Sequence, residues 1–413
     1  MRKIIPLPPL TRGLKDIKHM KIITDEKKIN EVLTRGANEV IVKEDLREKL
    51  LSGKKLRIKF GIDPTAAFLH IGHAVPLRKL KQFQDLGHEV ILLIGDYTAK
   101  IGDPTGRNEA RPLLSDAEIK KNMKTYTEQA GKVLNIKKVE IRYNSEWYKD
   151  KGAAFMLELT SLITVARILD RDDFQKRLKA DVDIQMQEIL YPLLQGYDSV
   201  VLKSDVEIGG TDQKFNLLMG RKLQKRYDQP EQDVITVPLL EGLDGVRKMS
   251  KSFGNFIALA DEPNEMFGKA MSVPDDLIIK YLELATEVPL EEIEEMSAKM
   301  KGGANPRDFK LKLAYELVKL YHDEKAAKSA QEYFAKTIQQ KGKPEEIPEI
   351  KPSAYDILTV LTEAKIAKSK SEARRLVEQG GVKVNDAKID SIETKVKAGD
   401  IVQKGSRFFI KVK

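Results

Sequence analysis

The order of apolar and polar residues along the chain predicts alternating strands and helices. Residues 30–50 have helical spacing and predict a helix. Residues 55–62 alternate and then reach a Gly-Ile-Asp-Pro turn, which predicts a strand that ends in a loop. Residues 71–86 predict a second helix, ended by Gly87. Residues 89–94 are almost entirely apolar, as expected of a buried parallel strand.

Two further short strands are predicted, at 139–143 and 199–202, with helical stretches between the strands. Strands that alternate with helices are typical of βαβ units around a parallel sheet, so the fold class is α/β. The pattern changes after Asn255. Residues 262–338 have several helix-like segments and little strand signal, which indicates a separate helical domain.

The end of the chain is organised differently again. Residues 341–352 contain three prolines among charged residues and predict a linker. From Ser353 onward the pattern predicts a helix, a glycine stop and then strands. With 413 residues the chain is long enough for about three domains. We therefore predict a Rossmann-like parallel-sheet domain at 1–255, a helical domain at 256–340, the linker at 341–352, and a small α+β domain at 353–413.

Composition narrows the classes of protein. The chain has no cysteine, which excludes disulfides, thiolate metal sites and cysteine nucleophiles. The net charge of +9 favours an anionic partner. Residues 353–413 contribute 13 Lys+Arg minus 8 Asp+Glu, or +5, of that charge. No apolar run approaches the roughly 20 residues of a membrane helix, and no secretory signal is visible, so we expect a cytoplasmic protein that does not contact a membrane.

A short histidine string carries the first sign of a nucleotide site. His70-Ile71-Gly72-His73 begins a predicted helix, where free N–H groups and the helix dipole favour phosphate. The two imidazoles lie three residues apart on one face and can donate hydrogen bonds to triphosphate oxygens. Gly72 would let an adenine approach the backbone. Taken alone, such a pair is more often two ordinary histidines, and a zinc pair lacks supporting ligands.

A second string, Lys248-Met249-Ser250-Lys251-Ser252, follows a turn-rich stretch. Two lysines three residues apart suit a mobile clamp on pyrophosphate, although a basic run alone is usually a solvated loop. Their occurrence together with the histidine string favours an ATP site. Arg107 and Arg111, in and after the rigid turn Gly102–Arg107, either stabilise charge on the leaving phosphates or are ordinary surface arginines. No Walker A string occurs, which argues against a P-loop protein.

A polar trio lies within an otherwise apolar helical pattern. Tyr191, Gln195 and Asp198 stand at i, i+4 and i+7, on one helix face. Polar side chains among Leu and Ile are costly to bury without partners. The trio therefore predicts a polar pocket, the alternative being a helix that changes its exposed face.

These strings resemble the paired signatures of class I aminoacyl-tRNA synthetases, and the whole chain is similar to the bacterial tyrosyl-tRNA synthetases. The resemblance implies that Asp198 accepts the phenolic hydrogen of tyrosine. It also implies further tyrosine-binding residues, namely Asp103, Asn144, Tyr191, Gln195 and Gln213. The ATP-binding residues that it implies are Gly61, Asp63, His70, Gly72, His73, Gly210, Asp212, Lys248, Met249, Ser250 and Lys251.

The chain departs from that family at two positions. The family often has a tyrosine, as a second phenol partner, four residues before the aspartate that matches Asp63, and here that position is Lys59. Lys214 replaces an aromatic residue that is common after the Asp-Gln pair. The departures leave open what else contacts the substrate hydroxyl.

The segment Ser369–Asn385 and the strands that follow resemble an S4-type RNA-binding domain. The resemblance implies that Arg374, Arg375 and Lys383 contact phosphates, and such contacts position RNA and make affinity depend on salt. The alternative is a small basic domain with a solvated face.

The activity implied by the resemblance is that of a tyrosine–tRNA ligase. Such an enzyme makes tyrosyl-AMP and pyrophosphate from tyrosine and ATP, and then transfers tyrosine to the 3′-terminal adenosine of tRNA(Tyr). The attacking carboxylate is already ionised, so we expect catalysis by positioning and charge stabilisation. The residues expected to do this are His70, His73, Arg107, Arg111, Lys248 and Lys251.

The same resemblance implies that the domain at 1–255 is catalytic and that the helical domain at 256–340 binds tRNA. It also implies a homodimer, Mg²⁺ that accompanies ATP and no tightly bound cofactor, and the sequence itself shows no dedicated set of metal-ligating residues. Three alternatives stay open. The chain could be a tryptophanyl-type synthetase, an RNA-binding protein with an inactive nucleotidyl domain, or a protein in which the S4-like tail alone acts.

Overall fold

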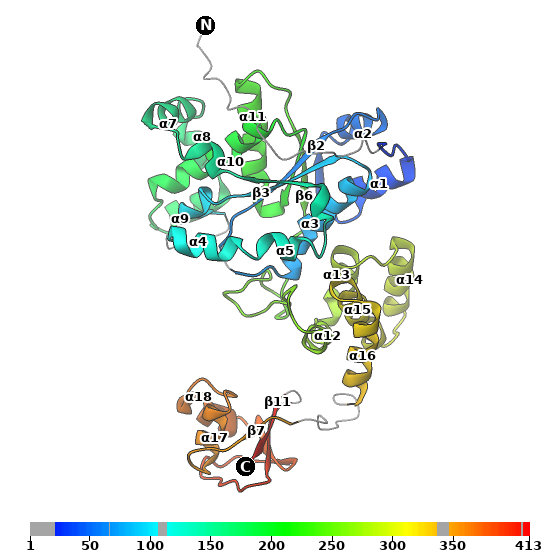
Figure 1. The fold of residues 1–413 in the computed structure, drawn as a ribbon, viewed down its shortest axis with the longest axis vertical. Coiled ribbons are helices and arrows are strands. Elements are labelled where there is room, and N and C mark those ends of the chain that lie inside the picture. Colours follow the sequence, from blue (N-terminus) through cyan, green and yellow to red (C-terminus); the bar gives the residue numbers. More distant parts are fainter. Residues whose placement is uncertain (1–20, 66, 106–113, 337–346, 406–407) are drawn as a thin grey trace. The chain divides into compact units, whose positions relative to one another are not determined.

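The computed structural model describes residues 21–65, 67–105, 114–336, 347–405 and 408–413 (Figure 1). It separates into two compact units, Met1–Glu324 and Lys325–Lys413. The finer division of the first unit near residue 255 stays a prediction. Arg107, Arg111 and residues 341–346 of the predicted linker lie outside the described residues.

A six-stranded sheet forms the centre of the first unit, in the order β1-β6-β5-β2-β3-β4. All neighbours pair in parallel except β1, which is antiparallel to β6. The strand order reverses at β2, which lies between β3 and β5, so a crevice is expected at the carboxyl ends of β2 and β5. The strands are β1 (Glu39–Ile41), β2 (Arg57–Ile62), β3 (Glu89–Ile94), β4 (Val139–Tyr143), β5 (Val206–Gly210) and β6 (Asp233–Val237).

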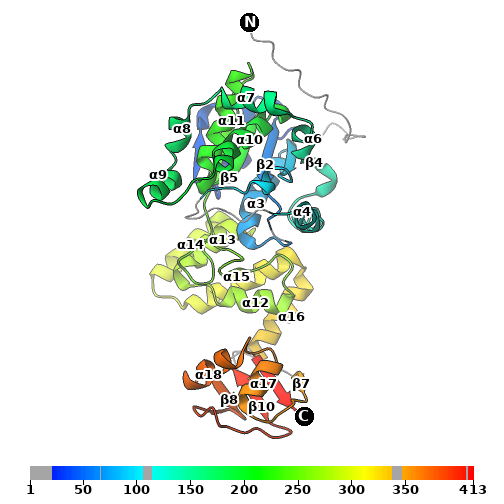
Figure 2. The ribbon, with the colours of Figure 1, turned by 90° about the vertical axis from the view of Figure 1, so that its left-hand side faces the viewer.

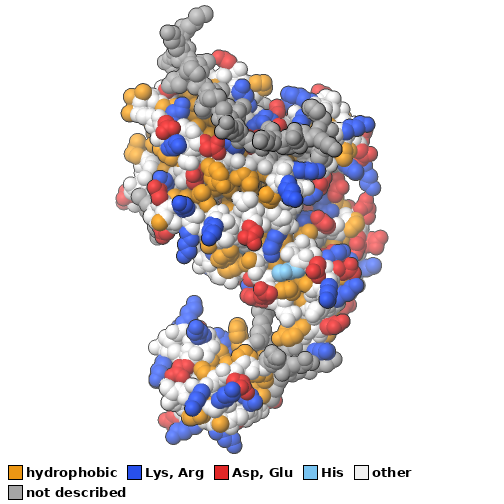
Figure 3. Space-filling model, viewed as in Figure 1, with side chains coloured by type: hydrophobic (Ala, Val, Ile, Leu, Met, Phe, Trp, Pro, Cys, Tyr) orange, Lys and Arg blue, Asp and Glu red, His pale blue; other side chains and the backbone are white. Residues whose placement is uncertain are grey.

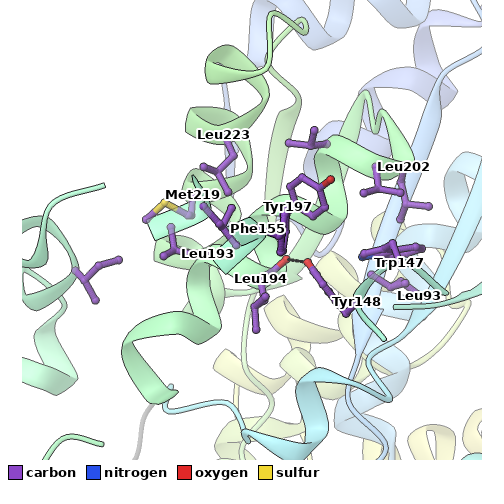
Figure 4. Close-up of a cluster of buried hydrophobic side chains, with 14 of the residues drawn as sticks. Leu93, Trp147, Tyr148, Phe155, Leu193, Leu194, Tyr197, Leu202, Met219 and Leu223 are labelled. Atoms are coloured by element: carbon purple, nitrogen blue, oxygen red, sulfur yellow. Dashed lines mark hydrogen bonds between the residues drawn. The ribbon is translucent and has the colours of Figure 1, made fainter. Parts of the chain in front are cut away.

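Helices cover both faces of this sheet (Figures 1 and 2). Ile91 and Leu93 of β3 belong to a buried cluster with α10 (Met186–Leu202) and α11 (Lys214–Arg226). Alternate strand residues point to the opposite face, which α3 (Ile71–Asp85) covers by packing on β2 and β3. In the cluster, Trp147 and Tyr148 lie beside α10 (Figure 4). The predicted α/β architecture is confirmed.

The other helices of the first unit surround this core. Those before and between the strands are α1 (Glu26–Thr34), α2 (Lys43–Leu51), η1 (Thr98–Lys100), α4 (Asp116–Met123), α5 (Tyr126–Ala130), η2 (Ile136–Lys138), α6 (Ser145–Tyr148), α7 (Ala153–Thr160), α8 (Val165–Leu169), α9 (Asp172–Lys179) and η3 (Thr211–Gln213). After the sheet come α12 (Pro263–Met271), η4 (Asp275–Leu277), α13 (Ile278–Ala285), α14 (Leu290–Lys301) and α15 (Pro306–Tyr321). α16 (Glu324–Phe334) begins at the unit boundary. Within the described parts of the chain, no helix has the length and apolarity to cross a membrane.

The structure confirms several predicted elements. The predicted strands at 55–62, 89–94 and 139–143 are β2, β3 and β4, and the predicted helix at 71–86 is α3. The region after Asn255 is helical as predicted.

Two predicted elements are wrong. The single helix over 30–50 is two helices with β1 between them, because Gly36 and Val42 adopt φ of 62° and 60° and interrupt the helix. The predicted strand at 199–202 is the last turn of α10. A short apolar run looks the same in a buried helix as in a buried strand, and here the strand is β5, a few residues later.

The second unit is a small α+β fold. Its five-stranded sheet has the order β7-β11-β10-β8-β9, in which only β7 and β11 pair in parallel. Residues of α17, α18 and the sheet form one buried cluster, which includes Val360, Val377 and Val402. Lysine and arginine side chains gather on the visible face of this unit (Figure 3). Its elements are β7 (Glu349–Ile350), α17 (Ile357–Glu363), α18 (Lys370–Glu378), β8 (Val382–Val384), β9 (Ala387–Lys388), β10 (Ile401–Lys404) and β11 (Phe408–Val412).

Close packing of α10 on α11 predicts a contrast between two glycines. A Cβ at Gly196 would lie 2.9 Å from Leu223 Cδ1 and 3.1 Å from the Met219 carbonyl carbon. We expect Gly196→Ala to lower the free energy of unfolding by about 1–3 kcal/mol. A Cβ added at Gly268, inside α12, would have nothing within 4 Å. Gly268→Ala should therefore raise the free energy of unfolding by up to about 1 kcal/mol. Denaturant unfolding measures both, and equal effects would contradict the packing described here.

Candidate active site

A cavity of ≈ 910 Å³ opens in the first unit where β2, β3 and β5 end. All the predicted ATP-binding and tyrosine-binding residues line it, and so do four of the six predicted catalytic residues. The other two, Arg107 and Arg111, lie outside the described residues. The predicted residues that line the cavity are Gly61, Asp63, His70, Gly72, His73, Asp103, Asn144, Tyr191, Gln195, Asp198, Gly210, Asp212, Gln213, Lys248, Met249, Ser250 and Lys251. The geometry brings them together, and their roles stay predictions.

Backbone hydrogen bonds join the start of the histidine string to residues 257–259, which follow the lysine string in the chain. The Ile71 N–H donates to the Ile257 carbonyl at 3.0 Å, and the Leu259 N–H donates to the Leu69 carbonyl at 3.0 Å. Asn255, which is 5% exposed, accepts from the Ser250 N–H at 2.8 Å. The lysine loop is thereby attached to the start of α3, and both strings face one cavity.

The two histidine rings lie close together at the start of α3, tilted by 39° to one another. Their ring centroids lie 3.7 Å apart, and the backbone N–H of His70 donates to His73 Nδ1 at 3.2 Å. Burial, with a smaller effect of Lys251, lowers the pKa of His70 to about 3, and burial also lowers the pKa of His73 well below its usual range. Both rings are therefore neutral near pH 7. As neutral rings they can still donate hydrogen bonds to phosphate oxygens, which is the role predicted for them.

Positive charge on this side of the cavity comes from the lysine loop. Lys248 Nζ lies 3.2 Å from Asp212 Oδ2, and its side chain is 45% exposed. Lys251 Nζ lies 4.3 Å from the Phe68 ring centroid, and burial lowers the pKa of Lys251 to about 8. Gly72 lies between the rings and the loop, because a Cβ there would meet His70 Nδ1 at 3.0 Å and Met249 Cβ at 3.5 Å. Two ammonium groups therefore border the same space as the neutral imidazoles.

A buried carboxylate lies at another part of the cavity. Asp198, on α10, is 2% exposed. Its Oδ1 accepts from Trp147 Nε1 at 2.9 Å, and its Oδ2 lies 3.4 Å from Asn144 Nδ2. Burial raises the pKa of Asp198 to about 6, although Lys59 and the hydrogen-bond donors around the carboxylate lower it. Near pH 7 the carboxylate is mostly ionised and can accept a hydrogen bond from a ligand.

The side chains between these two regions form a hydrogen-bonded chain. Tyr191 Oη donates to Asp63 Oδ2 at 3.0 Å, and Thr98 Oγ1 donates to Asp63 Oδ1 at 2.8 Å. Asn144 Nδ2 in turn donates to Thr98 Oγ1 at 3.0 Å. A Cβ at Gly95 would meet Asp63 Oδ1 at 2.0 Å, so this close approach requires glycine. The chain fixes side chains that follow β2, β3 and β4.

A second chain of contacts positions Gln213 and Asp103. Gln213 Nε2 donates to Asp103 Oδ2 at 2.6 Å, and Gln213 Oε1 accepts from Asn216 Nδ2 at 3.0 Å. Asn216 Oδ1 accepts from Arg171 at 3.1 Å. Arg171, 4% exposed, also donates to Thr105 Oγ1 at 3.0 Å. The hydrogen bond from Asn216, which is itself bonded to Arg171, thus fixes the Gln213 amide, and that amide in turn fixes the Asp103 carboxylate beside the cavity.

The sequence analysis missed several of these residues. Trp147 and Thr98 contact predicted site residues, but no short-range spacing marks them. Arg171 lies at the start of α9 and was not singled out at all. Thr98 carries one usable signal, since it stands four residues after a predicted strand end, where ligands bind in parallel sheets.

The remaining predicted residues are not among those that line the cavity. Lys214 is paired with Glu39, its Nζ 2.7 Å from Glu39 Oε2, and does not line the cavity. Arg374, Arg375 and Lys383 are exposed on α18 and β8 of the second unit. Over the part of the chain that is described, no three His, Asp or Glu side chains come together as a metal-binding group.

Fold and site together define a class of protein. A parallel sheet opens at its switch point into a cavity, with a histidine pair on the helix after β2 and a lysine loop beyond β6. This is the arrangement of class I synthetases, which join an amino acid to a nucleotide.

Comparison with known proteins identifies the family. The family described as tRNA synthetases class I (W and Y) matches residues 51–339, and the S4 domain family matches residues 357–402. The chain therefore belongs to the class I tRNA synthetases. Its curated relatives place it among the tyrosine–tRNA ligases of that class.

Two relatives and one solved structure illustrate the match. A tyrosine–tRNA ligase of Dehalococcoides mccartyi is 50% identical over 390 residues, which cover 94% of this chain and 98% of that protein. One of Thermotoga maritima is 50% identical over 394 residues, with the same coverage. A C-terminally truncated mitochondrial tyrosyl-tRNA synthetase of Aspergillus nidulans superposes with a TM-score of 0.61 at 25% identity, covering 74% of this chain and 92% of that one.

Trp147 is the only tryptophan in the sequence, so its fluorescence should report on Asp198. The carboxylate is ionised above its pKa of about 6 and protonated below it. As pH falls through about 6, the indole loses its charged acceptor and the emission should change with that midpoint. Asp198→Asn should abolish the transition. Glu146→Gln, which removes a carboxylate paired with Arg142 near the same indole, should keep it; a transition that persists in Asp198→Asn would refute the assignment.

Proposed function

We propose that this protein is a tyrosine–tRNA ligase. It activates tyrosine with ATP, giving tyrosyl-AMP and pyrophosphate, and then transfers tyrosine to the 3′-terminal adenosine of tRNA(Tyr). The observation that carries the proposal is a single cavity bordered by Lys248 and Lys251 in one part and by the buried acceptor Asp198 in another. Membership of the family, and relatives named tyrosine–tRNA ligase over 94% of the chain, support it.

In the first step a carboxylate oxygen of tyrosine bonds to the α-phosphorus of ATP, and the bond from that phosphorus to the bridging oxygen breaks. Pyrophosphate leaves with the bonding electrons. No proton has to be removed from the attacking carboxylate, so binding and charge stabilisation supply the catalysis. Lys248 and Lys251 offset charge on the leaving group. His73 donates from Nε2, because its Nδ1 already accepts from the His70 N–H.

Tyrosine would bind with its hydroxyl at Asp198 and its amino-acid end near Asp103, Tyr191, Gln195 and Gln213. Asp63 follows β2, Gly210 is the last residue of β5 and Asp212 comes two residues later; these three would bind on the adenosine side. Arg107 and Arg111 are proposed as further charge donors to the phosphates. Mg²⁺ is proposed to enter with ATP, as part of the substrate.

The second unit is proposed to bind RNA. Arg374, Arg375 and Lys383 are exposed, and contacts from them to phosphates would weaken steeply as salt rises. We also retain the proposed segments at 1–255, 256–340, 341–352 and 353–413, a homodimer and a cytoplasmic location as parts of this proposal.

Amino-acid-dependent exchange between ATP and pyrophosphate tests the function. Across a panel of amino acids, tyrosine should support exchange, and phenylalanine and tryptophan should not. Sites that hydrogen-bond a substrate hydroxyl reject the analogue without it by about 10⁴–10⁵-fold, and tyrosyl enzymes are themselves the standard case. Exchange with tryptophan instead would favour the tryptophanyl alternative, and exchange with no amino acid would leave only an RNA-binding role.

Lys248→Ala should slow activation rather than weaken tyrosine binding. Its ammonium borders the phosphate part of the cavity, so its loss should lower kcat for exchange by at least about 10²-fold, with KM for tyrosine within about twofold. Steady-state exchange kinetics measure both. The control is Lys280→Ala. Lys280 Nζ lies 2.7 Å from Glu241, which precedes the lysine loop in the sequence, but Lys280 does not line the cavity. Unchanged exchange in Lys248→Ala would refute the role of this lysine.

A further inference from the structure

A lysine lies buried in the sheet beneath the proposed tyrosine pocket. Lys59 is in the middle of β2, is 0% exposed, and lines the cavity. Strand register sets it opposite Glu207 of β5, and the two side chains form an ion pair of 2.9 Å in which Glu207 is 1% exposed. Burying two charges costs free energy that the pair often fails to recover, so their position calls for an explanation.

Lys59 has no N–H group left for a substrate. A lysine ammonium has three donors, and here three acceptors lie within reach of Nζ. They are the Gln195 carbonyl at 3.2 Å, Ser199 Oγ at 2.8 Å and Glu207 Oε1 at 2.9 Å. Lys59 therefore does not take over the direct hydroxyl contact of the tyrosine that the family often has at this position.

The partners of Lys59 close the network around it. Ser199 Oγ donates to Glu207 Oε2 at 3.0 Å, and Gln232 Nε2 donates to the same oxygen. Ser199 directly follows Asp198 on α10, and the Gln195 carbonyl lies one turn before it. The ammonium is thus attached to the turn of α10 that carries Asp198.

Lys59 and Asp198 line the same cavity, and the Lys59 ammonium donates to Ser199, the residue that follows Asp198. Burial raises the pKa of Asp198, and among the groups that oppose this rise Lys59 has the largest effect, ahead of Tyr148, Trp147 and Asn144. Besides Lys59, the titratable groups that face Asp198 are the phenols of Tyr148 and Tyr191, and burial raises the pKa of each well above its usual range. Neither phenol titrates where the carboxylate does.

We propose that Lys59 is a positioning residue whose buried charge keeps Asp198 an ionised acceptor for the substrate's phenolic hydroxyl, while Lys59 itself does not touch that hydroxyl. The proposal rests on the proposed tyrosine-activating function. It identifies Lys59 as a determinant of the choice between tyrosine and phenylalanine, which acts through Asp198.

Two variants separate charge from packing. Lys59→Met combined with Glu207→Gln removes both charges and leaves no unpaired ion, and the amide introduced on β5 can still pair with Ser199 and Gln232. Glu207→Gln alone keeps the charge of Lys59. The readouts are the pH midpoint of Trp147 emission and kcat/KM for tyrosine and phenylalanine in pyrophosphate exchange, each measured from pH 5.5 to 9.

In the double variant the emission midpoint should rise by about one pH unit or more, because an opposite charge at this range typically lowers a carboxyl pKa by about 1–3 units. The kcat/KM for tyrosine at pH 7 should follow the ionised fraction of Asp198. It should fall about twofold if the midpoint rises by one pH unit and about tenfold if it rises by two, and it should recover toward pH 9, whereas the kcat/KM for phenylalanine should change little. Glu207→Gln alone should not raise the midpoint.

Lys79→Met is the matched control. Lys79 is also buried, at 3% exposed, but its ammonium donates to the backbone carbonyls of Val32 and Arg35, outside the cavity. Its replacement should lower thermal stability and leave the emission midpoint and the tyrosine-to-phenylalanine ratio unchanged.

The remaining outcomes overturn the inference in distinct ways. An unmoved midpoint, with equal loss of activity at every pH, would make Lys59 a packing residue only. Loss of tyrosine activity even at pH 9, where Asp198 is ionised, would make it a direct hydroxyl donor. If the wild-type protein does not activate tyrosine, the proposed function fails, but the midpoint of the double variant still tests the effect of Lys59 on Asp198.

Discussion

The parallel pairing of β2 with β5 is the contact on which the rest of the site depends. It reverses the strand order, and it brings Asp63 and Asp212, which follow the two strands, to one edge of the sheet. The same register sets Lys59 beside Glu207 on the face covered by α10. A slip of one residue in β2 would turn Lys59 to the face covered by α3. The register of β2 against β5 therefore brings the two charges together, and the ion pair in turn favours that register over a slipped one.

The cavity is divided electrostatically. Beside the lysine loop the positive charges are on Lys248, which is 45% exposed, and Lys251, and the two histidine rings are neutral. In the part proposed to bind the amino acid, Asp198 is almost fully buried and held by hydrogen bonds from fixed donors. A charge that can move suits a triphosphate that must enter and a pyrophosphate that must leave. A fixed, dry acceptor suits recognition of one hydroxyl, because electrostatic interactions are stronger away from water.

The features that could be predicted from the sequence are those that depend on residues close together in the chain. β3 and α3 follow from runs and periods within one segment, and the shared face of Tyr191, Gln195 and Asp198 follows from helical spacing alone. Spacing predicted only a polar pocket, and the roles within it came from family resemblance. Contacts across the fold were invisible, such as that of Trp147 with Asp198 over a separation of 51 residues. The strand predicted at 199–202 is helical in the structure, because periodicity cannot separate a short buried strand from a buried helix.

Lys59 shows why a departure from a family pattern can keep a function. A buried ion pair is weak evidence for stability, because well-packed apolar residues often do as well or better in its place. This pair adjoins the turn of α10 that carries Asp198. A tyrosine at this strand position would give the substrate hydroxyl a second partner. A lysine instead acts on the first partner, favouring the charged form of the carboxylate that burial disfavours. Both arrangements make the site depend on a hydroxyl, the first by adding a hydrogen bond and the second by strengthening the acceptor.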